Sequence, residues 1–599
     1  MRSRVCCPSS AALTTALALS SAVSAVRLTD LGTGESVRQE VLSGGGMAGE
    51  GNGGDGPLNE EFGAFTRERL ERWHVPGIAV AVVDGEETWT QGYGISSFPS
   101  NPVTPSTLFY AGSTTKAFTA AIVSQLIDSE SYTFDSGPLS WQTPLAQLLP
   151  EDFVLAPGYE WEAAHLNLED ALSHRSGFPR HDKALARRYG VDGHPGTVRD
   201  VVRSMRYLPM VSEPRTEWRY CNVMYMVVSH AVQTLTGRWL GDLMKEGIWE
   251  PLGMGDTFLS VEEAVAKGRE VAKGREVAKG REVAGGYYWD YKGKGGFVEV
   301  PKLGLELANG AGGVVSNVRD YARWVKCLIK GDKGGEGVGC TVLSKEAHRE
   351  LKRARMVKGL GSKKGYDAPM AYALGWEIGT YKGHRVFTHS GGMEAYGALV
   401  YFFPDLEYGV ITLGNTAITS NVVGNELIWK LIDDKLGISE EDRYDWASLG
   451  NKTVQQALKQ PETAVEELYP ERAIPPLPRT LSLQEYVGIY SHPAYQNITI
   501  ELIDGADATA RSSPAKTQEQ KAELKADRGN MEWQMTFEFI HVSGEFWAVI
   551  IDMLNSPNSL NGQLARAEFV VGVKGKVDKL KMEFLEDGSE GVIVFDKIA

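Results

Sequence analysis

The feature that most constrains the fold is the placement of strand-like segments at both ends of a long helical stretch. Near the start, residues 78–83 and 88–93 are β-type runs joined by Asp84-Gly85, a pattern typical of a hairpin. The later runs are 372–378, 385–388, 397–403 and 409–413, and Pro404-Asp405 marks the turn before the last one. This arrangement predicts one antiparallel sheet flanked by helices, with a helical subdomain inserted between its two halves.

Helical spacing fills the region between these strands and the stretch before the first one. Residues 58–74 place apolar side chains on one helix face, and Pro76 follows. A second helix begins near Ser113, with Phe118, Ile122 and Leu126 at intervals of four. Residues 165–255 are mostly helix and loop. The sequence therefore predicts a mixed α/β (α+β) domain.

Changes in composition divide the chain into five parts. Residues 1–25 are typical of a secretory signal peptide, because two arginines precede an apolar run and small residues precede Ala25. Residues 26–57 form a glycine-rich flexible spacer. A main domain is expected over 58–437, a polar linker over 438–480, and a domain of short strands over 481–599. Strands of that kind predict a small β-barrel or sandwich, with residues 504–530 as a long exposed loop.

Composition excludes several classes of protein. The formal net charge of −15 argues against nucleic acid as a partner, because phosphate binding needs a basic face. No apolar run is long enough to span a membrane. Cleavage after Ala25 leaves three of the five cysteines, and a Cys327–Cys340 disulfide is one pairing that the spacing does not decide. We expect a secreted glycoprotein, with acceptor patterns at Asn451 and Asn497.

A hexad, Val-Ala-Lys-Gly-Arg-Glu, occurs three times in tandem over residues 265–282. Three short polar units cannot bury a core by stacking, so they do not build a solenoid. A charged docking arm is one interpretation of this repeat. An insertion in a surface loop or an exposed helix is the favoured one.

Ser113 and Lys116 are the first candidates for chemistry. A serine and a lysine three positions apart lie on one helix face, so their polar ends can meet. A buried lysine with a depressed pKa can accept the serine proton, and the helix start offers backbone N–H groups to an oxyanion. The pattern repeats at residues 513–516, but in a polar, proline-containing loop. Other hydrolase, phosphate-loop and zinc motifs are missing, so we expect no metal or organic cofactor.

Two further elements follow in the chain, Tyr220-Cys221-Asn222 and His389-Ser390-Gly391-Gly392. With Ser113 and Lys116, their order and spacing resemble the β-lactamase-related, penicillin-recognising serine hydrolases, which include class C β-lactamases, D-aminopeptidases and esterases. Supporting segments lie at 172–177, 310–313 and 372–376. The resemblance implies a β-lactamase/transpeptidase-like fold over about residues 58–437, and residues 481–599 more loosely resemble a lipocalin-like domain found in some members.

The resemblance also implies a role for each residue. Ser113 would be the nucleophile and Lys116 its partner, while Tyr220 would act first as general base and then as acid. Asn222 would hold the substrate and Lys116. The oxyanion hole would use the N–H groups of Ser113 and Gly392. Ser390 and Gly391, next to Gly392, are candidates for binding the substrate. A tyrosine near pKa 10 is a poor base at neutral pH, so nearby cations are expected to lower its pKa. Cys221 is expected to be a buried structural thiol, and His174 a structural residue.

His389 is also a candidate catalytic residue, but it departs from the β-lactamase pattern, in which the third triplet opens with lysine. A histidine is largely neutral at pH 7.5, so it provides no fixed cation for a substrate carboxylate. We therefore expect a secreted serine hydrolase that cleaves esters or amides, including peptides with D-amino acids, through an acyl-enzyme, with weak β-lactamase activity at most. The C-terminal domain is expected to lie over the site. An acyltransferase with the same acyl-enzyme and a non-catalytic binding or assembly protein on this fold are the alternatives. The substrate is a small molecule or a peptide, and the sequence leaves the oligomeric state open.

Overall fold

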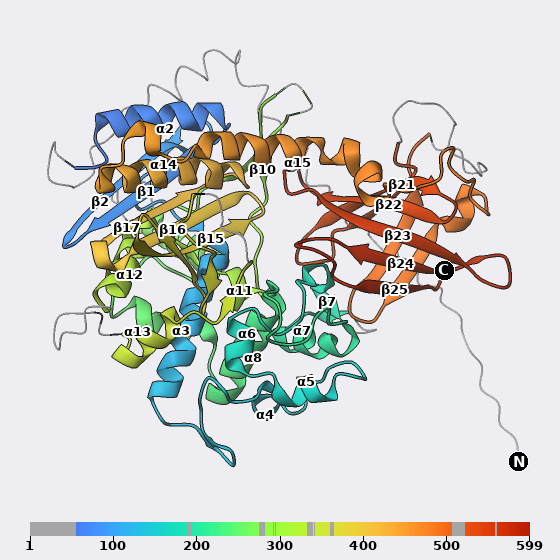
Figure 1. Ribbon diagram of the computed structural model, residues 1–599, viewed down its shortest axis with the longest axis horizontal. Coiled ribbons are helices and arrows are strands. Elements are labelled where there is room, and N and C mark those ends of the chain that lie inside the picture. Colours follow the sequence, from blue (N-terminus) through green and yellow to red (C-terminus); the bar gives the residue numbers. More distant parts are fainter. Residues whose placement is uncertain are drawn as a thin grey trace, which may run out of the picture.

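The computed structural model describes residues 56–189, 193–274, 282–291, 293, 295–331, 340, 342–359, 365–505, 521–556 and 560–599. The expected signal peptide at 1–25, nearly all of the spacer and the second serine–lysine pattern at 513–516 lie outside these residues. Figure 1 shows two bodies side by side, a larger mixed one and a smaller β one at the carboxyl end.

One antiparallel sheet organises the larger body. Within the described residues it has nine strands in the order β12-β13-β14-β15-β16-β17-β1-β2-β3. The strands are β1 (Gly77–Asp84), β2 (Glu87–Ser97), β3 (Asn101–Pro102), β12 (Met356–Val357), β13 (Ala371–Tyr372), β14 (Glu377–Tyr381), β15 (His384–Met393), β16 (Tyr396–Phe403) and β17 (Tyr408–Gly414). Val82 of β1 is paired with Trp89 on one side and with Val410 on the other. The amino-terminal hairpin thus joins the later strands, which confirms the predicted sheet.

One strand predicted from the sequence consists of two strands in the structure. The run at 372–378 is split between β13 and β14, because the chain turns at Gly375 with a φ of +78°. A Cβ at this position would lie 2.8 Å from the backbone nitrogen of Ala117. Only glycine combines this backbone conformation with so close an approach to the helix that follows Ser113.

Helices cover both faces of the sheet (Figure 1). On one face lie α2 (Glu60–Arg72) and α14 (Thr419–Leu436), whose apolar side chains share a core with β1 and β17. On the other face α12 (Val318–Lys330) packs on β1 and β17, and α3 (Thr115–Asp128) and α8 (Asn222–Thr236) lie beyond it. The remaining helices of the larger body are α4 (Leu145–Leu148), α5 (Glu160–His165), α6 (Leu168–Leu172), α7 (Val198–Ser204), α9 (Leu240–Met244), α10 (Val261–Gly274), α11 (Asn309–Gly312) and α13 (Lys345–Lys352).

The segment expected as a polar linker contains a long helix, α15 (Trp446–Leu468), which runs from the sheet to the smaller body (Figure 1). At its start, Trp446 stacks on Trp429 of α14 with ring centroids 4.9 Å apart. At its end, Ala464, Val465 and Leu468 pack against strands of the smaller body. Its apolar residues are few and serve two different cores, so the segment shows no continuous apolar stripe in the sequence.

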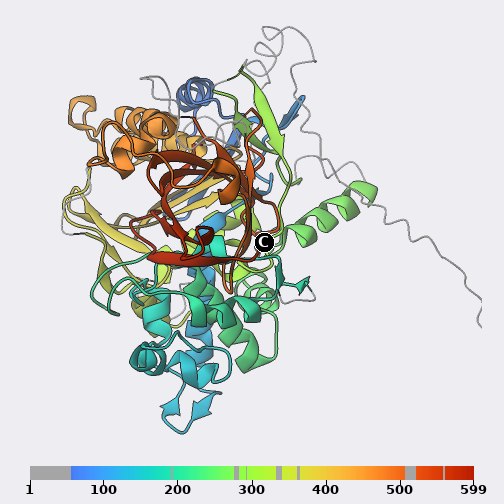
Figure 2. The same ribbon diagram turned by 90° about the vertical axis from the view of Figure 1, so that its right-hand side faces the viewer.

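The smaller body is a closed barrel, which faces the viewer in Figure 2. Within the described residues its strands are β18 (Gly488–His492), β19 (Gln496–Leu502), β20 (Leu524–Arg528), β21 (Met535–Ser543), β22 (Phe546–Met553), β23 (Gln563–Val571), β24 (Val577–Phe584) and β25 (Val592–Lys597). The pairing of β18 with β25 closes the barrel, and aromatic rings such as Trp547 and Phe569 fill it. The small β domain is therefore confirmed, but β20 lies in the expected loop, because its polar residues hide the alternation that buries Leu524, Ala526 and Arg528.

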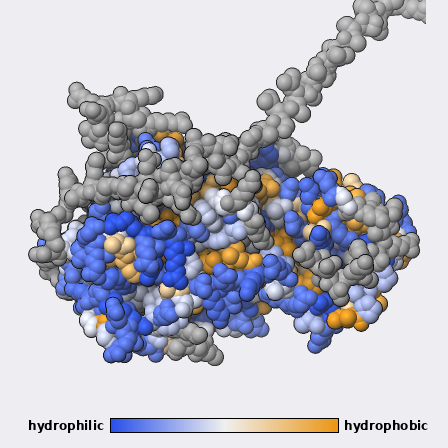
Figure 3. Space-filling view, turned by 90° about the horizontal axis from the view of Figure 1, so that it is seen from above, coloured by the Kyte–Doolittle hydropathy of each residue, from blue (hydrophilic) through white to orange (hydrophobic). Residues whose placement is uncertain are grey.

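A disulfide joins Cys327 of α12 to Cys340, the pairing that the spacing left open. Residues 265–274 of the repeat lie in α10 (Val261–Gly274), and residues 275–281 are outside the described part. The face seen in Figure 3 is mostly hydrophilic where it is coloured. No helix in the described ranges has both the length and the apolar character to cross a membrane.

Candidate active site

The predicted nucleophile stands where α3 meets the sheet. Gly112, with a φ of +51°, begins a 3₁₀ turn over Gly112–Thr114 that leads into α3. A Cβ on Gly112 would lie 2.7 Å from the backbone nitrogen of Gly392 on β15. The glycine therefore lets the start of α3 approach β15, so that Ser113 and Gly392 lie next to each other. This is the arrangement that two oxyanion-hole donors need.

Lys116 lies one helix turn further on and is fully buried. Its Nζ is 3.1 Å from Ser113 Oγ, 2.8 Å from Asn222 Oδ1 and 2.8 Å from the carbonyl oxygen of Ala311. Burial lowers the pKa of Lys116 well below its usual value, and the charge of Arg180 lowers it further. The sequence-based expectation of a lysine with a depressed pKa agrees with this environment.

Tyr220 faces the nucleophile from the other side. Its hydroxyl is 2.8 Å from Ser113 Oγ. The residues next to it are both tied to His174, because Arg219 N donates to the His174 carbonyl at 2.8 Å and Cys221 N donates to its Nδ1 at 3.0 Å. The His174 ring also packs on Tyr220, with centroids 4.2 Å apart. His174 therefore holds Tyr220 in place, and Cys221 is a free, buried thiol, as expected.

The expected lowering of the Tyr220 pKa is wrong. Burial raises the pKa of Tyr220 well above its usual value, and the Arg180 charge only partly offsets this effect. The cations are present, since Lys116 Nζ lies 4.8 Å and the Arg180 guanidinium 5.0 Å from the centroid of the ring. Tyr220 is thus a neutral phenol at physiological pH, and Lys116 is the better proton acceptor of the two.

His389 lies behind Tyr220, with ring centroids 6.5 Å apart, and its side chain is buried. Its Nδ1 is 2.7 Å from the carbonyl oxygen of Ser390, which can only accept, so Nδ1 carries the proton. Burial lowers the pKa of His389 to about 4, so the ring is neutral at physiological pH, as expected. Ser390 is exposed, whereas Asn421 Nδ2 donates to the Gly391 carbonyl at 2.9 Å and supports the strand from α14.

Sequence reasoning missed two residues beside this centre. Asp182 accepts from Asn222 Nδ2 at 2.9 Å, which turns the Asn222 oxygen toward Lys116. Arg180 pairs with Asp182 at 3.0 Å and also reaches two acids of the barrel. Both follow the family-like segment 172–177, but neither lies in a recognisable motif. The barrel thus borders the site, in keeping with the expectation that the C-terminal domain lies over it.

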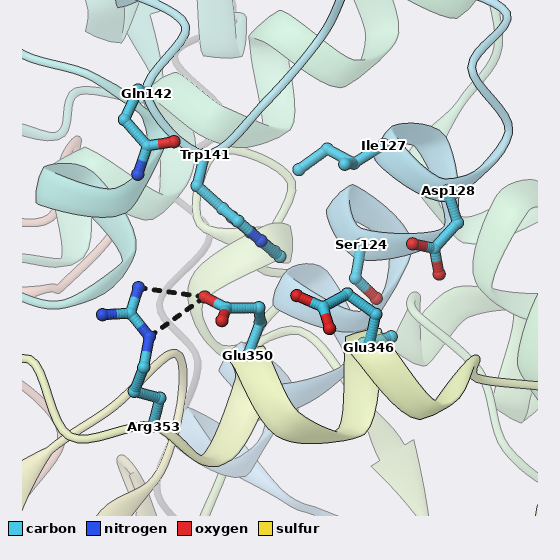
Figure 4. A pocket seen from close by; sticks show the side chains of 9 residues that line it. Ser124, Ile127, Asp128, Trp141, Gln142, Glu346, Glu350 and Arg353 are labelled. Atoms are coloured by element: carbon cyan, nitrogen blue, oxygen red, sulfur yellow. Dashed lines mark hydrogen bonds and ion pairs between the residues drawn. The ribbon is translucent and has the colours of Figure 1, made fainter.

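Two other features lie away from Ser113. Within the described residues, the one group with metal-type ligand atoms close together is Cys327, Cys340 and His348, and a disulfide joins its two cysteines. A cavity of about 330 Å³ lies at the far end of α3 (Figure 4), roughly 16 Å from Ser113 at 1.5 Å per residue. Its lining residues are Ser124, Ile127, Asp128, Trp141, Gln142, Glu346, Ala347, Glu350 and Arg353.

An antiparallel sheet, a serine and a lysine at the start of the helix beside it, and a tyrosine that faces the serine together define a serine hydrolase of the β-lactamase type. The family model described as Beta-lactamase matches residues 62–432, and a Domain of unknown function (DUF3471) matches residues 472–595. The chain therefore belongs to the Beta-lactamase family and is a hydrolase of that serine type.

Similar proteins point the same way. The chain is 38% identical to unguisins hydrolase ungD' of Aspergillus campestris over 519 residues, which cover 87% of this chain and 88% of that protein. It is 38% identical to unguisins hydrolase ungD of Aspergillus violaceofuscus, over 85% and 86% of the two chains. The fold is similar to the octameric penicillin-binding protein homologue from Pyrococcus abyssi, with a TM-score of 0.51, 18% identity, and coverage of 90% of this chain and 99% of that one.

Proposed function

We propose that this protein cleaves an amide or ester bond through an acyl-enzyme formed on Ser113. The observation that carries the proposal is the set of contacts around Lys116 Nζ. A neutral amine has two N–H groups and one lone pair. The oxygens of Asn222 and Ala311 can only accept, so they take the two N–H groups, and the lone pair is left for the hydroxyl of Ser113.

The first half of the reaction follows from this arrangement. Ser113 Oγ attacks the carbonyl carbon while its proton passes to Lys116, and the carbonyl oxygen takes the negative charge beside the N–H groups of Ser113 and Gly392. The bond to the leaving group then breaks. Tyr220, a neutral phenol 2.8 Å from Ser113 Oγ, gives its proton to the leaving amine or alcohol and recovers one from Lys116.

Water attacks the acyl-enzyme in the second half. It loses its proton to Lys116 through the same contacts, the ester bond to Ser113 breaks, and the serine hydroxyl is restored by microscopic reversibility. The two relatives that are named for unguisins support a hydrolytic outcome, so an unguisin is the first natural compound to offer the enzyme.

We also infer that the protein is exported through a secretory route. The Cys327–Cys340 disulfide supports this inference, because disulfides persist in oxidising compartments. Both glycosylation acceptors, Asn451 and Asn497, are exposed and accessible to modification. Mass spectrometry of secreted protein would test both points, since it gives the start of the mature chain and the mass of any glycan.

The test of the catalytic proposal is hydrolysis of a p-nitrophenyl acyl ester, with covalent labelling by a fluorophosphonate probe. Ser113→Ala should lose on the order of 10⁶ in turnover and all labelling. Ser124→Ala is the matched control, since Ser124 lies on the same helix and bonds to the Ala121 carbonyl. Label on a residue other than Ser113, or equal activity of the three proteins, would overturn the proposal.

A further inference from the structure

A loop of the barrel reaches the catalytic centre. Residues 585–591 connect β24 to β25, and three acids of this loop pair with cations of the larger body. Arg180 lies 3.0 Å from Glu586 and 3.0 Å from Asp587, while Lys183 lies 3.0 Å from Glu586 and 3.0 Å from Glu590. The Lys183 and Glu590 side chains are almost wholly buried. This loop therefore forms an ion-pair network inside the junction between the two bodies.

The network continues to the nucleophile without a gap. Arg180 Nε also donates to Asp182 at 3.0 Å, and Asp182 accepts from Asn222. Asn222 in turn accepts from Lys116 at 2.8 Å, and Lys116 faces Ser113. Each side chain in this series is a hydrogen-bond partner of the next. A displacement of Arg180 at the barrel end therefore affects the partners of Lys116 at the other end.

Arg180 also acts on both proton carriers through its charge. The guanidinium lies 5.0 Å from the centroid of the Tyr220 ring. Among the charged groups around Tyr220, Arg180 is the main one that lowers its pKa, and it also lowers the pKa of Lys116. A single cation thus makes both groups release protons more easily.

The larger body alone cannot hold this cation in the same way. Asp182 is the acid that it offers to Arg180 in the contacts described, and Asp182 is also bonded to Asn222. The barrel loop supplies the other two carboxylates, Glu586 and Asp587, on the side of the guanidinium toward the barrel. A planar guanidinium held by several carboxylates has a fixed orientation, which a lone ion pair does not give.

We propose that Arg180 is a positioning residue for Tyr220 and Lys116, and that Glu586 and Asp587 of the barrel hold it there, so the barrel completes the catalytic centre. This inference rests on the proposed function, since it assigns Tyr220 and Lys116 the proton transfers. The alternative is that the ion pairs only dock the barrel onto the larger body. The two alternatives predict different changes in the pH dependence of acylation.

The test measures kcat/KM against pH with a p-nitrophenyl ester, whose good leaving group makes acylation depend on the proton acceptor alone. Arg180→Gln removes a cation, so the pKa of Lys116 rises, and the acid limb of the profile shifts upward by about one pH unit. The rate at a fixed pH on that limb falls about tenfold. Arg180→Lys keeps the charge but not the planar guanidinium, so its acid limb should shift upward less than that of Arg180→Gln.

The loop variant Glu586→Gln/Asp587→Asn decides between the two views by the sign of its shift. If Arg180 stays in place without these acids, the loss of two negative charges lowers the pKa of Lys116, and the acid limb moves to lower pH. If the acids hold Arg180, the limb moves to higher pH, as in Arg180→Gln. Combining the two sets of substitutions should then add little, because they act through one element.

Several other ionisable groups lie near this centre and are not substituted in any variant. They are His174, His389, Asp182, Cys221 and Glu377, which is paired with Lys358 at 2.6 Å. The matched control is Glu568→Gln, which removes a barrel acid that pairs with Lys581 at 3.0 Å on the β23–β24 wall. This variant should leave the profile unchanged.

Thermal unfolding and circular dichroism establish that each variant is folded. If the double variant is unfolded, Asp587→Asn alone serves, since more than half of the Asp587 side chain is exposed. Folded loop variants with an unshifted acid limb, or one that moves to lower pH, would overturn the inference. Failure of the fluorophosphonate probe to label Ser113 in the unaltered protein would instead overturn the proposed function.

Discussion

The hydroxyl of Tyr372 donates to Nε2 of His389 across 2.9 Å, and the Nδ1 proton of the same ring goes to the Ser390 carbonyl. Both nitrogens of His389 are therefore used within the protein. The ring is buried between β13 and the Tyr220 side chain, where burial lowers its pKa to about 4. Its position on β15 is that of a supporting residue in neutral form.

The first prediction concerns pH. Because His389 is neutral from pH 5 to 8, it should not contribute a step to the pH profile of kcat/KM in that range. His389→Asn should lower kcat/KM at all pH values by a similar factor, less than about tenfold for one lost neutral hydrogen bond, and leave the shape unchanged. His384→Asn, on the same strand but partly exposed, is the control. An inflection near pH 6.5 that disappears in His389→Asn would contradict the prediction.

The second prediction concerns β-lactams. A charged hydrogen bond to a substrate carboxylate is worth about 1.5–3 kcal/mol, or on the order of 10- to 100-fold. The buried, neutral His389 cannot provide one. Chromogenic cephalosporin should therefore be turned over at least about tenfold more slowly than a p-nitrophenyl ester at matched concentration. Turnover at a rate comparable to the ester would show that another cation binds the carboxylate.

The sequence predicts which residues lie together around Ser113, because they occur in short, ordered patterns. Ser113 and Lys116 share one helix turn, and Tyr220 and Asn222 lie in one triplet, so local geometry brings each pair together. Arg180 and Asp182 carry no such pattern. Asp182 joins the site through Asn222, 40 positions later in the chain, and Arg180 is paired with a loop residue 407 positions later. No local spacing encodes either contact.

Contacts that are distant in the sequence also explain the two elements of the fold that were not predicted, α15 and β20. The sheet, the hairpin and the barrel strands follow from alternation and turn residues within a few positions. The helix α15 is stabilised by two separate cores, through Trp446 at one end and Leu468 at the other. The strand β20 depends on its neighbours β19 and β21 for its pairing. Both elements owe their structure to tertiary contacts more than to their own composition.

The third prediction concerns the disulfide. Cys327 and Cys340 are 13 positions apart, and closing a loop of about that size stabilises a fold by roughly 3 kcal/mol. The double variant Cys327→Ala/Cys340→Ala should lower the free energy of unfolding by about 2–3 kcal/mol in urea. Esterase activity should persist, because Cys327 lies six positions further along α12 than Tyr321, the residue of that helix that bonds to Thr114 beside Ser113. Reduction with dithiothreitol should reproduce the loss in the unaltered protein and have no effect on the variant.

The fourth prediction concerns Glu394, in the turn between β15 and β16. Only 5% of this residue is exposed, and burial raises the pKa of its carboxyl to about 7, while Asn555 and Arg187 oppose that shift. In the unfolded chain Glu394 ionises near pH 4.5. The free energy of unfolding therefore falls as the pH rises from 4.5 through 7.

Glu394→Gln removes this loss because an amide does not ionise. At pH 8 the variant should be more stable than the unaltered protein by about 3 kcal/mol, since each pKa unit is worth about 1.4 kcal/mol. At pH 4.5 the two proteins should be nearly equal. Urea unfolding followed by tryptophan fluorescence at both pH values measures the difference, with Glu87→Gln on the exposed start of β2 as the control. A variant that is destabilised at pH 8 would show that the Glu394 carboxylate is held by a favourable charge interaction, and that its burial does not govern its ionisation.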